Sequence, residues 1–194
     1  MDNVFSRDTY FAKMKFFKLF GNTIRIFDET KTNLLLYVKQ KAFKLREDIT
    51  CFADEQQTRP VLKINARNII DFSAAYDVTD VATGEKIGVL RRKGMMSSFV
   101  MDAWEILDKN DAVIGKIQEE SWILALIRRY LANIIPQKFM ISIGETPVGH
   151  AKQTWNPFLP QMRVDFSADT GKKLDRRLGL AAVVLLQVIE GKQR

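Results

Sequence analysis

The sequence predicts a mainly β (α+β) protein in which an antiparallel β-sandwich or β-barrel surrounds one buried C-terminal helix. Short runs of strand-forming residues, separated by turn signals, occupy most of the chain. A strand–turn–strand unit recurs three times with a glycine at the same place, and a segment near the end is apolar on almost every helical face. The chain has 194 residues, 46% hydrophobic and 27% charged, which is typical of one globular domain.

The first 21 residues predict an amphipathic helical segment that precedes the main domain, which we expect over residues 22–194. The residues that would share one helical face are Tyr10, Phe11, Met14 and Phe17, and the flanking cations are Lys13, Lys15 and Lys18. Basic, aromatic-rich helices lie in the interface of a membrane, so Phe11, Lys13, Phe17 and Lys18 are candidate membrane contacts. The alternative is that this segment packs against the main domain or closes one end of it.

The clearest strand patterns are those of 34–45, 61–66 and 140–143, where strand-forming residues form apolar or alternating runs. The turn signals between the expected strands are 28–31, 54–57, 82–85, 109–111 and 144–147. Each of them ends a strand through glycine or through hydrogen bonds from a side chain to the backbone. Many short strands with frequent turns favour an antiparallel sheet.

Gly88, Gly115 and Gly149 occupy the same position in three similar units, each of which is a strand, an acidic turn, an apolar residue, the glycine and a second strand. A glycine inside a strand marks a bulge or a close approach of another backbone segment. We therefore interpret the three units as successive hairpins of one sheet, with glycines at corners that let the sheet curve toward closure.

Two segments have helical patterns instead. Residues 121–135 place apolar side chains at helical spacing and stop at Pro136, which predicts a short amphipathic helix over the sheet. Residues 178–189 are apolar throughout except for Gln187, and Asp169 or Asp175 is expected to cap the start of this second helix.

The second helix must be buried, because it has no polar face. Twelve residues at about 1.5 Å each span roughly 18 Å, whereas a bilayer core is about 30 Å thick. Charged residues flank the segment on both sides, so the helix cannot be extended to cross a membrane. We expect strands to surround it.

Two residue types that often serve in active sites, cysteine and histidine, occur only once each. Cys51 is the only cysteine and lies in an alternating run, where a small buried side chain is expected, and His150 is the only histidine and has no metal-ligand spacing near it. No nucleophile elbow, phosphate-binding loop or dinucleotide motif occurs, so we expect neither an enzyme nor a metal or cofactor. The lack of disulfide pairing and of a secretory signal predicts a cytoplasmic protein.

Basic clusters are the candidate ligand-binding residues, since the net charge is +7 and favours anionic partners. Lys39 and Lys41 share one face of a strand, and Arg91, Arg92 and Lys93 follow a hairpin strand. Such cations hold phosphate groups. The alternative is a solvated outer face, or lysines that discourage strand addition.

Arg176 and Arg177 are a different case. They precede the terminal helix, where a positive charge opposes the helix dipole, so we expect them to pair with acidic residues on the rim of the sheet.

The order of these features resembles the tubby-like superfamily, and most of all its LURP-one-related and phospholipid scramblase-like branch, over about residues 22–191. The segments that carry the resemblance are 71–72, 76–80, 83–94, Trp104, 119–121 and 175–181. The resemblance implies a closed antiparallel β-barrel of about 12 strands around a buried hydrophobic C-terminal helix. The basic segment 172–177 departs from scramblases, which often carry an acidic calcium-binding loop before the final helix.

The resemblance also implies a function, because tubby proteins bind phosphoinositides through basic barrel residues. We therefore expect a non-enzymatic binding or scaffold domain that binds anionic phospholipid headgroups at the periphery of a membrane. The alternatives are a nucleic-acid-binding module, which the scattered cations favour less, and a scramblase-like activity. The sequence does not indicate an oligomeric state.

Overall fold

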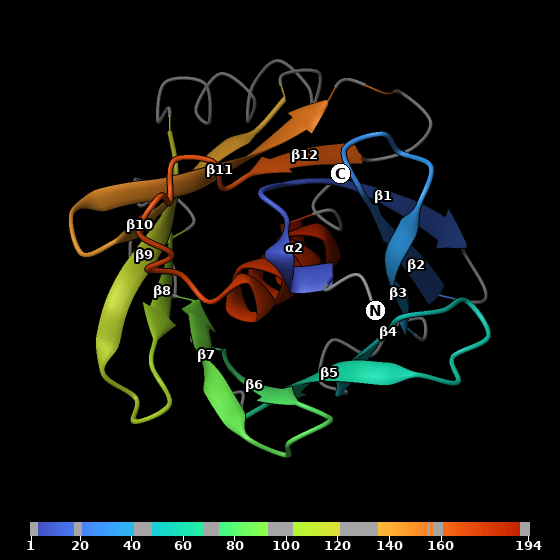
Figure 1. Cartoon of the computed structure of the whole chain (residues 1–194), viewed down its shortest axis with the longest axis horizontal. Helices are drawn as coiled ribbons and strands as arrows, with labels where there is room; N and C mark the ends of the chain where they lie inside the picture. Colours follow the sequence, from blue (N-terminus) through green and yellow to red (C-terminus); the bar gives the residue numbers. More distant parts are fainter. Residues whose placement is uncertain are drawn as a thin grey trace.

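The computed structural model describes residues 4–17, 21–40, 48–67, 74–92, 103–120, 136–154, 156 and 161–190, and every structural statement below concerns these residues. Twelve antiparallel strands form a closed barrel around one helix (Figure 1). The strands are β1 (Thr9–Phe17), β2 (Gly21–Phe27), β3 (Leu34–Gln40), β4 (Ile49–Phe52), β5 (Pro60–Ala66), β6 (Ala75–Asp80), β7 (Lys86–Arg92), β8 (Ala103–Leu107), β9 (Val113–Glu119), β10 (Lys138–Ile143), β11 (Thr146–Thr154) and β12 (Gln161–Asp165). Each strand pairs with the next in sequence, and β1 pairs with β12 to close the ring.

The N-terminal segment corrects the expectation of an amphipathic helix, because residues 9–17 form strand β1. Tyr10, Ala12 and Met14 are fully buried and point into the barrel. Lys13 and Lys15, at the alternate positions, are more exposed and lie on the outer face. The strand pairs with β2 on one side and with β12 on the other, so this segment is one of the strands of the barrel. A short 3-10 helix, η1 (Val4–Ser6), precedes it.

The recurring glycines lie beside β-bulges, as expected from their position in the hairpins. The register shifts between β6 and β7, between β8 and β9, and between β10 and β11, each time next to the glycine. A Cβ atom on Gly88 would stand 2.5 Å from the carbonyl oxygen of Leu107, and one on Gly149 would stand 2.6 Å from that of Asp165. A Cβ atom on Gly115 would meet the carbonyl oxygen of Ser142. Any larger residue would therefore push neighbouring strands apart at these corners.

The turns predicted from sequence are confirmed at the same end of the barrel. Asp54 and Asp108 accept hydrogen bonds from backbone N–H groups of their own turns, and Lys31, Gln57 and Asp111 adopt positive φ angles there. These are the local bonds that stop a strand and reverse the chain. The helix expected over residues 121–135 lies outside the described residues.

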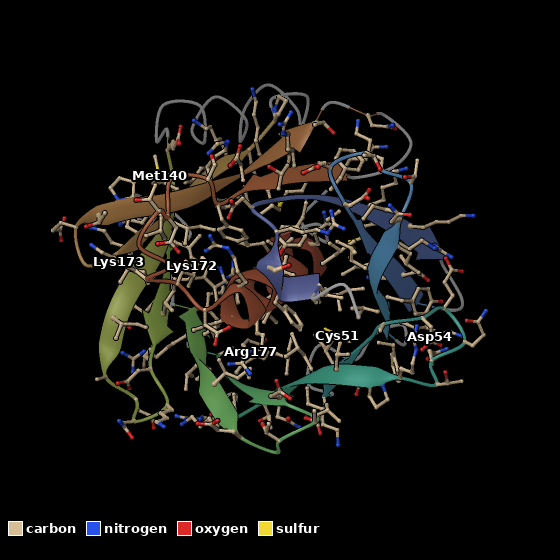
Figure 2. The ribbon with its side chains drawn as sticks, in the orientation of Figure 1. Cys51, Asp54, Met140, Lys172, Lys173 and Arg177 are labelled. Atoms are coloured by element: carbon tan, nitrogen blue, oxygen red, sulfur yellow. The ribbon has the colours of Figure 1, made fainter. Side chains whose placement is uncertain are left out.

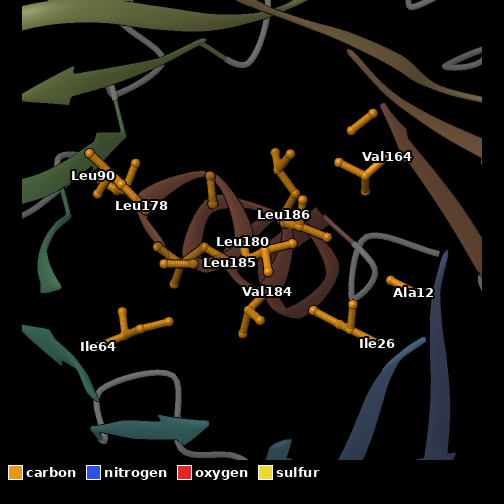
Figure 3. Close-up of a cluster of buried hydrophobic side chains, with 14 of the residues drawn as sticks. Ala12, Ile26, Ile64, Leu90, Val164, Leu178, Leu180, Val184, Leu185 and Leu186 are labelled. Carbon is orange, nitrogen blue, oxygen red and sulfur yellow. The ribbon is translucent and has the colours of Figure 1, made fainter. Parts of the chain in front are cut away.

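The helix α2 (Arg176–Glu190) lies in the centre of the barrel, as the red ribbon in Figure 1 shows. Every residue from Leu178 to Ile189 is at most 9% exposed. Figure 3 shows the side chains of α2, with Leu178, Val184, Leu185 and Leu186 labelled, between Ile26, Ile64, Leu90 and Val164 of the surrounding strands, and Leu178 lies beside Leu90. The expected burial of an all-apolar helix by the protein's own sheet is thus confirmed, and it fills the barrel with side chains.

Asp175 caps α2, because its Oδ1 accepts a hydrogen bond from the backbone N–H of Arg177 at 2.9 Å. Asp169, the other expected cap, instead binds the backbone N–H groups of Lys173 and Leu174 in the preceding loop. Asp175 therefore fixes the start of the helix, and Asp169 holds the loop that precedes it. No helix in the described part of the chain has the length and apolar character needed to cross a membrane.

Candidate anionic-ligand surface

The outer sides of β1, β2 and β3 bring basic and aromatic side chains together. The register places Lys13 of β1 opposite Arg25 of β2, and Arg25 opposite Tyr37 of β3. One row further along, Lys15 and Lys39 flank Thr23. We call this surface the β1–β3 face, and its residues are Phe11, Lys13, Lys15, Thr23, Arg25, Phe27, Tyr37 and Lys39, with Lys31 from the turn between β2 and β3.

Two lysines of the β1–β3 face lie over aromatic rings. The Nζ atom of Lys13 is 5.6 Å from the ring centre of Phe11 and 4.9 Å from that of Phe27, and the Nζ atom of Lys31 is 4.2 Å from that of Phe11. Phe11, expected as a membrane contact, is therefore on the outer face but only 4% exposed. Each such cation–ring contact is worth about 0.5–1 kcal/mol at an exposed site, which a stronger anionic partner can outcompete.

The cations of the β1–β3 face differ in whether a carboxylate already neutralises them. Arg25 donates to both carboxylate oxygens of Glu55, at 2.7 and 3.2 Å, and this hydrogen bonding raises its pKa. Among the described residues, no carboxylate forms a salt bridge with Lys13, Lys31 or Lys39. These lysines are the charges of the face that remain available to an external anion.

The other predicted basic residues do not join this surface. Arg91 lies on β7, and its Nη2 is 2.6 Å from Glu105 on β8, while the neighbouring Arg92 is half-buried and also has an interaction partner. Strands β4, β5 and β6 separate these arginines from Lys39 on β3. The remaining candidates, Lys18, Lys41 and Lys93, lie outside the described residues, as does the side chain of Phe17.

Several cations of the wall around β5 to β9 are paired with carboxylates. The Nη2 atom of Arg67 is 2.7 Å from Asp77 and 2.8 Å from Asp111, and the Nζ atom of Lys86 is 2.8 Å from Asp111. Hydrogen bonds from Arg67 and Lys86 lower the pKa of Asp111 to about 2. These paired cations offer little net charge to a partner, in contrast to the lysines of the β1–β3 face.

The arginines at the start of α2 have a structural role, which confirms the expected pairing with acidic residues. Arg176 binds Asp169 at 2.7 Å and Asp8 at 2.9 Å. Arg177, which is labelled in Figure 2, lies in the first turn of α2. It binds Asp80, at the end of β6, at 2.7 Å and Asp175 at 2.6 Å. These ion pairs fasten the helix to the rim of the barrel and leave neither arginine free for a ligand.

The cysteine and the histidine do not form a catalytic pair. Cys51 is fully buried on the inner side of β4, and desolvation raises the pKa of its thiol to about 12. His150 is half-buried on β11, opposite Met140 on one side and Asp165 on the other. Strands β4 and β11 are not neighbours in the barrel. No group of three potential metal ligands occurs among the residues that the structure describes.

The fold and the surface define the class of protein. It is a closed barrel of twelve described strands that encloses one helix and carries basic side chains on its β1–β3 face. The chain belongs to the LURP-one-related family, whose model matches residues 34–187, and this family is grouped with the tubby-like and scramblase-like proteins. No curated protein and no solved structure gave a significant match to the chain.

Sequence reasoning overlooked Lys31, Lys152 and Arg163. Lys31 was read only as part of a turn, and its place over Phe11 depends on the turn's conformation. Lys152 and Arg163 lie opposite each other on β11 and β12. The alternation of polar and apolar residues in 161–165 predicts that Arg163 points outward. The pairing of β11 with β12, which places Lys152 opposite it, cannot be seen in a local pattern.

Proposed function

We propose that this domain is a non-enzymatic binding module that docks on anionic membrane surfaces from the cytoplasmic side through its β1–β3 face. The observation that carries the proposal is that Lys13, Lys31 and Lys39 gather on one outer face, where no carboxylate of the described residues forms a salt bridge with them. The membership of the LURP-one-related family is consistent with a binding role but names no ligand.

The energetics of the face favour a lipid surface. A lysine near an anionic leaflet contributes about 1 kcal/mol, so the three lysines together contribute about 3 kcal/mol. When Lys13 and Lys31 turn toward phosphate groups, they uncover the Phe11 and Phe27 rings, which the interfacial region of a bilayer accepts. The same movement would expose apolar surface to water in the absence of a membrane, so the lysines cover the rings in the free protein.

The chemistry of the barrel supports a role in binding rather than catalysis. The only cysteine is buried and its thiol is held neutral, and the described acidic residues that are clustered are occupied by arginine or lysine partners. An active site needs an accessible group whose pKa suits proton transfer or nucleophilic attack. The described outer face of β1–β3 instead carries lysines that can bind an anionic surface.

The test is co-sedimentation of the protein with vesicles of neutral phosphatidylcholine, with and without about one third phosphatidylserine. We expect binding only to the anionic vesicles, and about 100-fold weaker binding for the variant K13Q/K31Q/K39Q, which is the equivalent of about 3 kcal/mol. The matched control K63Q/K109Q/K116Q removes the same charge from the remaining wall and should bind within a few-fold of the wild type, because salt screens distant charges.

Equal binding of the two triple variants would show that net charge, and not the β1–β3 face, drives association. No binding of the wild type to anionic vesicles would reject the lipid proposal. In that case, an affinity for RNA or DNA that falls steeply with salt would identify nucleic acid as the ligand instead.

A further inference from the structure

A second group of cations lies next to the β1–β3 face, at positions that the strand register makes directly opposite. Lys138 of β10 faces Lys152 of β11, Lys152 faces Arg163 of β12, and Arg163 faces Phe11 of β1. The row therefore runs across three strands and ends at the ring that Lys13 and Lys31 cover.

The members of this row differ in how they are neutralised. The Nζ atom of Lys138 is 2.8 Å from Glu120, which satisfies it within the protein. Lys152 and Arg163 are exposed, and among the described residues no carboxylate forms a salt bridge with either. The nearest acidic residue along β12 is Asp165, whose Oδ1 accepts a hydrogen bond from the backbone N–H of Ser167 at 2.8 Å. Burial alone would raise the pKa of Asp165, but the hydrogen bonds from Ser167 lower it and the charge of Arg163 contributes to the lowering, although no salt bridge joins Arg163 to Asp165 among the described contacts.

Opposed like charges are unfavourable in a sheet. Side chains directly across an antiparallel pair have Cβ atoms about 4.5–5.5 Å apart, and two cations at such positions repel each other. A dianion placed between Lys152 and Arg163 would reverse this repulsion, because it neutralises both at once. A guanidinium grips two oxygens of a phosphate in a fork, and an ammonium adds a compact point charge beside it.

We propose that Lys152 and Arg163 form a phosphate clamp that selects lipid headgroups ending in a phosphomonoester. Such a group carries close to two negative charges and three terminal oxygens at neutral pH, whereas a phosphodiester carries one charge and two free oxygens. The inference rests on the proposed function, since the clamp adjoins the β1–β3 face and reads the same membrane surface. The five adjacent strands β11, β12, β1, β2 and β3 then form one docking wall, and the barrel lies on its side on the membrane.

The experiment compares vesicles that contain phosphatidic acid, a phosphomonoester, with vesicles that contain phosphatidylglycerol, a phosphodiester, matched to equal surface potential. We expect the wild type to prefer the phosphatidic acid vesicles about tenfold. The variant K152Q/R163Q should lose this preference and bind both vesicle types equally and more weakly than the wild type, because two charges of the docking wall are removed. R163K keeps the charge but not the fork, so it should lose most of the preference as well.

Two controls separate the clamp from general effects. K63Q/K109Q removes two charges from another wall and should leave the tenfold preference unchanged. The melting temperature of K152Q should equal or exceed that of the wild type, because removing one of two opposed cations relieves their repulsion.

Equal affinity of the wild type for the two matched vesicles, with binding to both, would overturn the clamp and leave the proposed function standing. A preference that survives in K152Q/R163Q would also overturn it. Absence of binding to both vesicle types would instead reject the proposed function, on which the clamp depends.

Discussion

Removal of the Asp169 carboxylate is expected to be among the most destabilising changes at the start of α2. Its side chain is 1% exposed. It accepts hydrogen bonds from the backbone N–H groups of Lys173 and Leu174, at 2.8 and 3.1 Å, and from the Nη1 atom of Arg176 at 2.7 Å. Alanine at this position leaves two backbone donors and one arginine without their acceptor.

The magnitude follows from what Arg176 retains. Breaking a buried ion pair by removing one partner costs about 3–5 kcal/mol. Arg176 keeps a contact with Asp8 at 2.9 Å and lies 4.8 Å from the centre of the Phe166 ring, so the lower value of about 3 kcal/mol applies. For a chain of this size each kcal/mol lowers the melting temperature by about 2–4 °C, which gives a fall of about 6–12 °C.

Urea unfolding, followed by tryptophan fluorescence, measures this free energy directly. Asp8→Ala is the matched control: it removes the other carboxylate bound to Arg176, which is 60% exposed and should cost at most about 1 kcal/mol. Asp169→Asn keeps one acceptor oxygen, which can satisfy one of the two backbone N–H groups, so it should fall between the two. If Asp169→Ala proved no more destabilising than Asp8→Ala, the view that this buried carboxylate anchors the helix would be wrong.

The same residue predicts a dependence on pH. Burial alone would raise the pKa of Asp169, but the hydrogen bonds from Arg176 and from two backbone N–H groups outweigh it and lower the pKa. A depressed folded pKa stabilises the protein above the unfolded value of about 3.9, and this stability is lost as the pH falls through the folded pKa. As the pH falls below about 4, the wild type should therefore lose more stability than Asp169→Asn.

Two further substitutions test the corners and the core of the barrel. Gly88→Ala should destabilise by about 1–3 kcal/mol, because its Cβ atom would stand 2.5 Å from the carbonyl oxygen of Leu107, whereas Gly171→Ala meets only ordinary contacts and should be near neutral by thermal unfolding. Gln187→Leu should raise the free energy of unfolding by about 1 kcal/mol, because the Oε1 atom of Gln187 is buried without a hydrogen-bond partner; a destabilised variant would mean that this oxygen is satisfied in solution.

The central features of the fold were predictable because they depend on local composition. A segment with no polar face and too few residues to span a bilayer has to be covered by the chain itself, and Leu178 to Ile189 are covered. The recurring glycines signalled corners because only a residue without Cβ fits beside the carbonyl oxygen of a neighbouring strand.

The N-terminal helix was wrongly predicted because the pattern was ambiguous. Tyr10 and Met14 are four residues apart, which suits one face of a helix and equally one face of a strand. Ala12 is the inward residue between them, but its small side chain gave little hydrophobic signal. The deciding contact is the pairing of β1 with β12, which joins Tyr10 to Val164 across most of the chain.

The candidate surface was predictable only in part. The outward direction of Lys39 follows from strand alternation. Arg91, in contrast, is neutralised by Glu105, which lies opposite it on the next strand, and this pairing cannot be seen in the local sequence around Arg91. The register of strands therefore decides which cations are neutralised, and a single sequence does not display that register.

The closed ring of strands limits how partners can bind. A sheet that ends in free strands offers rows of unpaired N–H and C=O groups, to which an extended peptide can add as one more strand. Here β1 pairs with β12, so the ring of described strands contains no edge strand. Recognition by this domain must therefore run through side chains and turns, and it is tunable by single charge substitutions without disturbing the backbone ladder.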